Sequence, residues 1–104
     1  MLRVYALGKP SVTEGFPFGE DVLVFKVNNK IFLLMPLTAH PFQFNVKCDP
    51  EKAIELREEY PDHILPGYHM NKKYWNTVIA KGKLSKKLLL QMVDDSYGLV
   101  VGKR

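Results

Sequence analysis

Cysteine and long apolar runs are scarce in this sequence, and both absences are informative. Cys48 is the single cysteine, so no intrachain disulfide can form, which is typical of proteins from reducing compartments. The longest unbroken apolar run, residues 31–35, is far shorter than the roughly 18 residues that a membrane-spanning helix needs. No apolar run follows Met1 that would serve as a signal peptide. We therefore expect a cytoplasmic protein without membrane attachment.

Motifs for metals, nucleotides and nucleophilic catalysis are missing as well. The glycines never reach the spacing of a phosphate-binding loop, and one cysteine with histidines at 40, 63 and 69 forms no zinc pattern. No Ser, His and Asp arrangement marks a nucleophile. Cys48 precedes a predicted helix, whose dipole would favour a thiolate, but a buried and inert cysteine is the more ordinary interpretation. We expect no cofactor, no metal and no enzymatic activity.

Length and composition fit one folded domain. The chain has 104 residues, of which 46% are hydrophobic and 25% are charged, as in ordinary globular domains. A chain of this size buries roughly two-thirds of the surface that it exposes when unfolded, enough for one core without disulfides. We expect a single domain, residues 1–104, that is a monomer.

Charge is distributed unevenly along the chain. The net charge is +4, yet residues 1–68 carry seven Lys or Arg against nine Asp or Glu, while residues 69–104 carry eight against two. Six lysines and no acid lie between residues 70 and 87: Lys72, Lys73, Lys81, Lys83, Lys86 and Lys87. Such a segment attracts polyanions such as DNA, although a hydrated basic face that maintains solubility is an equally ordinary explanation.

The apolar pattern predicts an α+β domain with the order α-β-β-β-α-β-α. An Asn-Asn pair between two apolar runs indicates a hairpin, because asparagine tolerates the positive φ of tight turns. Asp49-Pro50-Glu51 is a strong helix start. The predicted helices are residues 2–7, 49–60 and 85–101, and the predicted strands are residues 22–27, 30–35, 42–47 and 74–79. Residues 64–70 contain Pro66-Gly67 and are expected to form a loop or a short edge segment. We expect an antiparallel sheet with helices packed on one face.

The densest group of chemically versatile side chains lies in residues 66–78. Hydrogen-bonding groups, basic groups and flat aromatic rings alternate there, a mixture suited to phosphate contacts beside base contacts. It equally suits a small pocket for an acidic ligand, or a structural corner in which Trp75 is buried and Asn71 closes the turn.

Three segments resemble the MmcQ/YjbR family: TEGFPFGEDVLVFKV (13–27), FNVKCDPEKAIELREEYP (44–61) and PGYHMNKKYWNTV (66–78). The resemblance implies a CyaY-like fold, the arrangement of sheet and helices also found in frataxin, with DNA binding as the common family label. The family's leading helix begins earlier than this chain does, so we expect a shortened first helix. Family membership implies no catalytic residue.

The leading hypothesis is a small DNA-binding protein. The six lysines would contact phosphates, and His69, Asn71, Tyr74 and Asn76 would lie near the groove; six phosphate contacts predict a salt slope of about −5. The alternative is a module that binds a small molecule or a protein in a pocket formed by Tyr68, His69, Trp75, Asn76 and Lys47. A metal-binding role for the acidic helix 51–62 is weaker, because a hydrated carboxylate face explains it.

Overall fold

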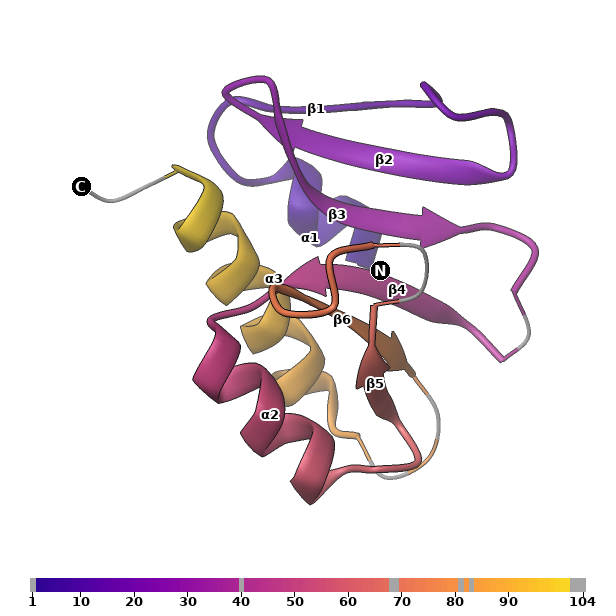
Figure 1. The fold of residues 1–104 in the computed structure, drawn as a ribbon. Coiled ribbons are helices and arrows are strands. Elements are labelled where there is room, and N and C mark those ends of the chain that lie inside the picture. The colour runs from indigo at the N-terminus through magenta and orange to yellow at the C-terminus, as the bar shows by residue number, and fades with distance from the viewer. Residues whose placement is uncertain (1, 40, 68–69, 81, 83, 102–104) are drawn as a thin grey trace.

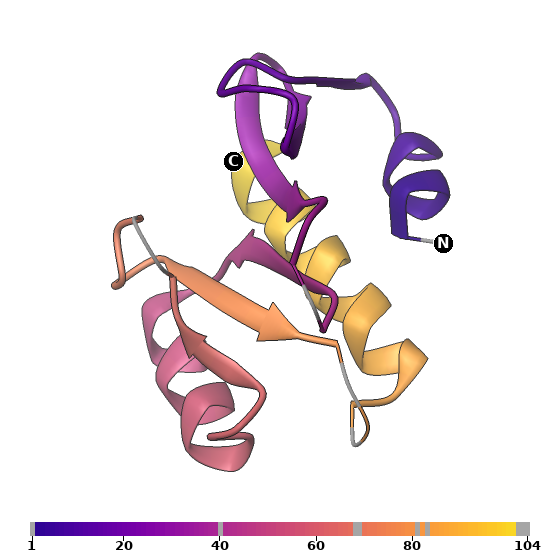
Figure 2. The ribbon, with the colours of Figure 1, turned by 90° about the vertical axis from the view of Figure 1, so that its right-hand side faces the viewer.

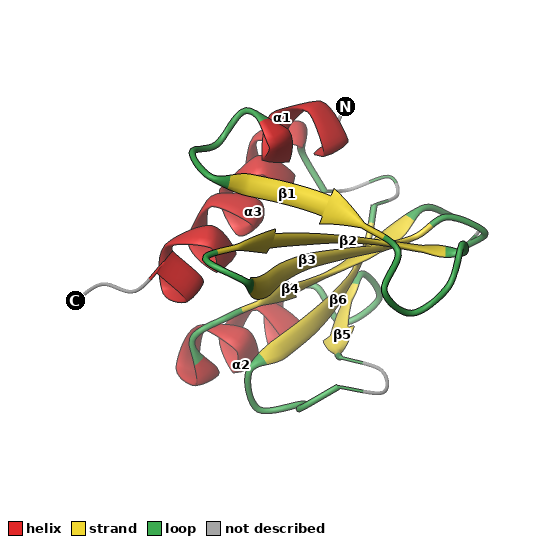
Figure 3. Cartoon of the chain, turned by 90° about the horizontal axis from the view of Figure 1, so that it is seen from above, coloured by secondary structure: helices red, strands yellow, loops and turns green. Residues whose placement is uncertain are grey.

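The computed structural model describes residues 2–39, 41–67, 70–80, 82 and 84–101. Three helices and six strands follow one another as α1 (Leu2–Leu7), β1 (Val12–Gly15), β2 (Val22–Val27), β3 (Lys30–Pro36), β4 (Gln43–Lys47), α2 (Pro50–Glu59), β5 (Ile64–Pro66), β6 (Trp75–Ile79) and α3 (Lys86–Val101) (Figure 1). The strands form one antiparallel sheet in the order β1-β2-β3-β4-β6-β5, which Figure 3 shows from above. The α+β class and the antiparallel sheet predicted from the sequence are confirmed.

Two strands, β1 and β5, were not predicted as strands. Both lie at the edges of the sheet, where one neighbour suffices for pairing and a regular apolar alternation is not required. β1 has the sequence Val-Thr-Glu-Gly with no residue fully buried, and β5 is three residues long and ends in Pro66. Proline is tolerated at such an edge, so residues 64–66 form the short edge segment that was one of the two expectations.

The two faces of the sheet differ in what covers them. A single core contains buried side chains from all three helices and alternate strand residues, including Phe25, Phe44 and Val78. Val24 and Leu34 are also buried but lie outside that core. Because strand side chains alternate, they belong to the opposite face, which we call the helix-free face. The strand positions of this face are Thr13, Gly15, Val22, Val24, Lys26, Ile31, Leu34, Pro36, Gln43, Asn45, Lys47, Leu65, Trp75, Thr77 and Ile79.

Ser96 of α3 joins β3 to β4 where their pairing is interrupted. Phe32 is an extra residue in the β2–β3 register, and β3 and β4 pair directly only at Leu33 and Leu34. The fully buried Ser96 hydroxyl donates to the Phe32 carbonyl at 2.5 Å and accepts the Lys47 amide at 2.9 Å. The serine therefore satisfies two backbone groups that the sheet leaves unpaired.

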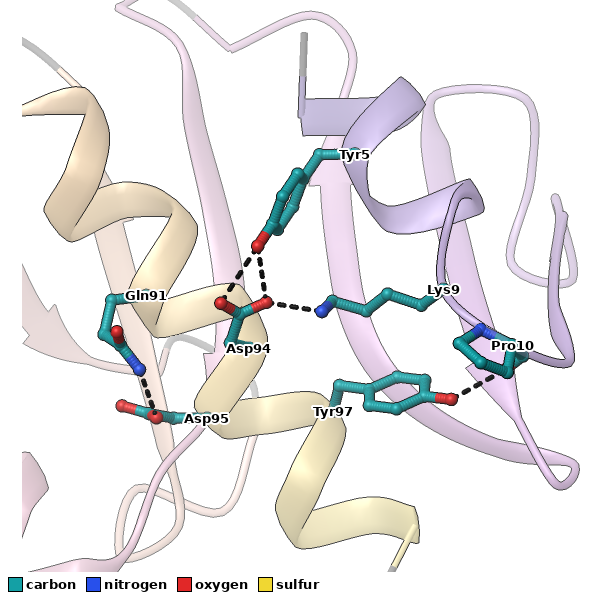
Figure 4. Close-up of polar contacts among 7 residues, drawn as sticks. All are labelled: Tyr5, Lys9, Pro10, Gln91, Asp94, Asp95 and Tyr97. Atoms are coloured by element: carbon teal, nitrogen blue, oxygen red, sulfur yellow. Dashed lines mark hydrogen bonds and ion pairs between the residues drawn. The ribbon is translucent and has the colours of Figure 1, made fainter.

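Helix α1 is held against α3 by a polar cluster (Figure 4). The Tyr5 hydroxyl donates to the Asp94 carboxylate at 2.8 Å, which raises the pKa of Tyr5. Lys9 forms an ion pair with Asp94, and its ammonium lies 4.9 and 5.1 Å from the ring centres of Tyr5 and Tyr97. Leu2 and Ala6 of this six-residue helix are buried in the core. Packing therefore stabilises a helix too short to persist alone.

The start of α2 agrees with its sequence signals. The Asp49 carboxylate accepts the amides of Glu51 and Lys52 at 3.2 and 3.3 Å, and Pro50 occupies the first helical position. Among the helices that the structure describes, none is long and apolar enough to cross a membrane.

Candidate functional site

The described residues of the 66–78 motif form a tight corner that leads into β6. The Gly67 amide donates to the Trp75 carbonyl at 2.8 Å, and a side chain at position 67 would place its Cβ 2.7 Å from the Trp75 Cβ. Asn71 closes the turn, because its side chain accepts the Lys73 amide and its carbonyl accepts the amides of Tyr74 and Trp75. Glycine and asparagine at these positions are thus explained by the backbone geometry.

Arg57 of α2 attaches this corner to the helices. Its Nε donates to the Asn76 Oδ1 at 2.7 Å, and its Nη2 donates to the carbonyls of Lys72 and Trp75. Asn76 is 1% exposed and faces the helix-covered side, with Val78 as its same-side neighbour on β6. Its buried position contradicts the expectation that Asn76 contacts DNA or lines a surface pocket, because the side chain is enclosed between the sheet and α2.

The predicted pocket is not formed as expected. Trp75 pairs directly with Lys47 on the helix-free face, whereas Asn76, the next residue, points to the opposite face. The side chains of Trp75 and Asn76 therefore do not face one pocket. Tyr68 and His69, the other two residues of that prediction, lie outside the described residues.

The lysines of residues 72–87 form two separate groups. Lys72 and Lys73 are exposed in the turn before β6, while Lys86 and Lys87 are exposed at the start of α3, beyond the other end of that strand (Figure 2). The Cα atoms at the two ends of β6 are roughly 13 Å apart, and the two groups lie beyond opposite ends of this strand. None of these four lysines forms an ion pair with a carboxylate in the described part of the chain. Lys81 and Lys83 lie outside the described residues.

The aromatic residues of the motif differ in exposure. Tyr74 is 38% exposed and carries the Lys73 ammonium 5.6 Å from its ring centre, so it accompanies the first lysine group. Trp75 is half-buried on the helix-free face. Among the described aromatic side chains of this segment, Tyr74 is therefore the one that lies beside the first lysine group.

A groove on the helix-free face was not identified from the sequence. Its volume is about 520 Å³, and no helical residue lines it. Its walls and floor are Phe18, Val22, Ile31, Leu34, Pro36, Gln43, Asn45, Met70 and Thr77. Phe18 and Met70 come from two segments that carry the family resemblance, and their convergence depends on the sheet topology, which no local pattern contains. The sequence feature that points to this groove is Phe18 followed by Gly19. In the structure Phe18 is exposed and Gly19 has a φ of 118°.

Cys48 has the properties of a buried thiol. It is 7% exposed, and burial, with smaller contributions from Asp95 and Asp49, raises its pKa to about 11. A thiol with this pKa is protonated at neutral pH and therefore a poor nucleophile. Among the described residues, no group of three or more His, Cys, Asp or Glu side chains is placed to hold a metal ion.

The fold defines a small α+β protein built on one antiparallel sheet. The YjbR family model matches residues 7–99, so the chain belongs to the YjbR family. It is 44% identical over 97 residues to the uncharacterized protein YbdF of Escherichia coli O157:H7, covering 92% of this chain and 78% of YbdF. It is 33% identical over 55 residues to the uncharacterized protein YyaQ of Bacillus subtilis, covering 53% of this chain and 45% of YyaQ.

Two solved structures share the fold. The Deinococcus radiodurans protein DR2400, described as a DUF419 domain, superposes with a TM-score of 0.93 at 40% identity, covering 98% of this chain and 77% of DR2400. A protein from Pseudomonas syringae gives a TM-score of 0.73 at 27% identity, with 93% of each chain covered. The names of these relatives assign no ligand and no reaction, so function has to be argued from the residues.

Proposed function

We propose that this chain is a DNA-binding protein that contacts phosphates with its two lysine groups and does not act as an enzyme. The observation that supports this proposal is the exposure of Lys72, Lys73, Lys86 and Lys87, none of which is paired with a carboxylate of the described residues. When an unpaired lysine contacts a DNA phosphate, counterions condensed on the DNA are released. This release drives non-specific DNA binding.

Two separated lysine groups suit the two phosphate backbones of a DNA duplex better than one cluster of lysines would. They lie beyond opposite ends of β6, whose terminal Cα atoms are roughly 13 Å apart, and the major groove of B-DNA is about 12 Å wide. Lysines at the two ends of one strand can therefore contact phosphates on opposite sides of a groove. Tyr74 and the exposed Asn71 lie beside the first group, where they can approach the sugar or the base edges.

The test is fluorescence anisotropy of a labelled duplex and a labelled single strand, titrated at three salt concentrations. The variants Lys72→Gln/Lys73→Gln and Lys86→Gln/Lys87→Gln should each weaken binding to all sequences and reduce the slope of log affinity against log salt by about 2. Lys30→Gln/Lys52→Gln is the matched control, because it removes the same charge from exposed positions outside both groups.

Equal loss in the control and in the two test variants would mean that net charge alone, and no particular surface, attracts DNA. Absence of binding at low salt would make the proposal wrong. Loss in only one test variant would overturn the arrangement across a groove and confine the contact to one end of β6.

A further inference from the structure

The groove on the helix-free face has a composition unlike that of an ordinary wet sheet surface. Leu34 is 8% exposed on its floor, and Ile31 and Met70 are half-buried at its sides. Phe18 is 65% exposed at the rim, a large apolar ring that the chain leaves in water. A volume of about 520 Å³ lies within the range of small-molecule sites, which are concave and mostly apolar with a few placed polar groups.

One polar side chain on the groove floor has unused hydrogen-bonding capacity. Asn45 is 9% exposed, and its Oδ1 accepts the Thr77 hydroxyl at 2.5 Å. Its amide nitrogen donates no hydrogen bond to any described residue, although a primary amide carries two donors. Because Asn45 lines the groove, an acceptor atom on a bound molecule can use this donor.

The charge at the described strand positions of this face is positive. Lys26 and Lys47 are the charged residues at its described strand positions, and neither forms an ion pair with a described carboxylate. Lys26 pairs with Ile31, a lining residue, and Lys47 is two residues from Asn45 on the same face of β4. Both lysines therefore border the end of the groove at which Ile31 lies.

We propose that this groove is a binding site for a small, flat aromatic anion. The ring system would lie between Phe18, Met70 and the Leu34 floor, and the anionic oxygens would accept from the Asn45 amide and face Lys26 and Lys47. The apolar walls favour a ring, the unused Asn45 donor favours an acceptor atom, and the two lysines favour a negative charge on the bound molecule. None of the described lysines proposed to contact DNA lines this groove, so the proposal does not depend on DNA binding.

Two dyes that differ by one charged group test the proposal directly. Anilinonaphthalene sulfonate carries a sulfonate on a flat ring system, and phenylnaphthylamine is the same ring system without it. We expect the sulfonate dye to bind about tenfold more tightly, because charge-assisted hydrogen bonds add to the apolar contacts. Fluorescence titration gives both affinities, and perturbed backbone and side-chain amides in isotope-labelled protein locate the bound dye.

The variants separate the apolar and anionic parts of the site. Phe18→Ala should weaken both dyes about fivefold, whereas Phe16→Ala, an exposed phenylalanine of the same loop that does not line the groove, should leave both unchanged. Asn45→Leu and Lys47→Gln should weaken the sulfonate dye toward the affinity of the neutral dye and leave the neutral dye bound. Lys52→Gln, on α2, is the charge control.

Perturbation of the Asn45 side-chain amide with the expected selectivity would support the site. Equal affinity for the two dyes would overturn the anionic part of the proposal, and perturbations confined to α2 and α3 would overturn its location. Both phenylalanines are at least half exposed, so their variants should fold, and amide spectra without dye verify this. If the lysine variants lose DNA binding but bind the dyes unchanged, the two proposed sites are independent of each other.

Discussion

The two faces of the sheet differ in how far they expose apolar side chains. On the helix-covered face, Phe25, Phe44 and Val78 have no exposed surface, and the buried Ser96 hydroxyl is satisfied by backbone, whereas the Asn76 amide nitrogen is buried without a hydrogen-bond partner among the described residues. On the helix-free face, Leu34 and Val24 are nearly as buried, yet Phe18 is 65% exposed and the Asn45 amide nitrogen donates to no described residue. The exposed ring of Phe18 therefore distinguishes the two faces more clearly than the unused amide donors do, and it fits the binding proposed for the helix-free face.

Substitutions at two neighbouring residues of β4 test the difference between the two faces most directly, and they have the largest expected effect on stability. Phe44 and Asn45 point to opposite faces. Phe44→Ala should lower the free energy of unfolding by about 3–5 kcal/mol, because it removes a fully buried ring and leaves a cavity. Asn45→Leu should change it by less than about 1 kcal/mol, because the lost hydrogen bond is offset by apolar contact. Urea unfolding monitored by circular dichroism measures both; equal losses would mean that the helix-free face is also structural.

The Ser96 bridge is a second, smaller test of how the helix-covered face is built. Ser96→Ala should cost about 1–3 kcal/mol, because the Phe32 carbonyl and the Lys47 amide both lose their partner in a dry environment. Hydrogen exchange at the Lys47 amide should accelerate more than that of other β4 amides.

Gln91→Ala is the control for Ser96→Ala. Gln91 is exposed on the same helix and bonds only Asp95 among the described residues, so its loss should stay within about 0.5 kcal/mol. If Lys47 exchange is unchanged in Ser96→Ala, the serine does not replace the missing strand pairing.

The sequence predicted what depends on local chemistry and missed what depends on topology. The Asp49-Pro50-Glu51 helix start and the Asn28-Asn29 hairpin were predictable, because capping and positive φ at 52° and 65° are properties of single residues. The edge strands were missed because they need only one neighbour. The buried position of Asn76 was missed because its partner, Arg57, is 19 residues away on α2. The groove requires Phe18 and Met70 to meet across the sheet, and no spacing in the sequence encodes that.

Cys48 gives the comparison its smallest test, since its titration changes the stability only above about pH 9. The thiol lies at the end of β4 within the core of the helix-covered face, and burial raises its pKa to about 11 from an ordinary value near 9.0. Because the folded state holds the proton more tightly, the contribution to stability is complete below the unfolded pKa and is lost as the pH rises toward 11. At about pH 8, alkylation by iodoacetamide should be slow in the native protein and fast in urea.

Raising the pH from 9 to 11 should lower the stability of the unmodified protein more than that of Cys48→Ala. Comparing the two slopes removes the contributions of tyrosine and lysine titration, which both proteins share. Rapid native alkylation with identical pH slopes would show that this end of β4 is open to water. Cys48 would then be accessible to solvent, and the core of the helix-covered face would not extend to this end of β4.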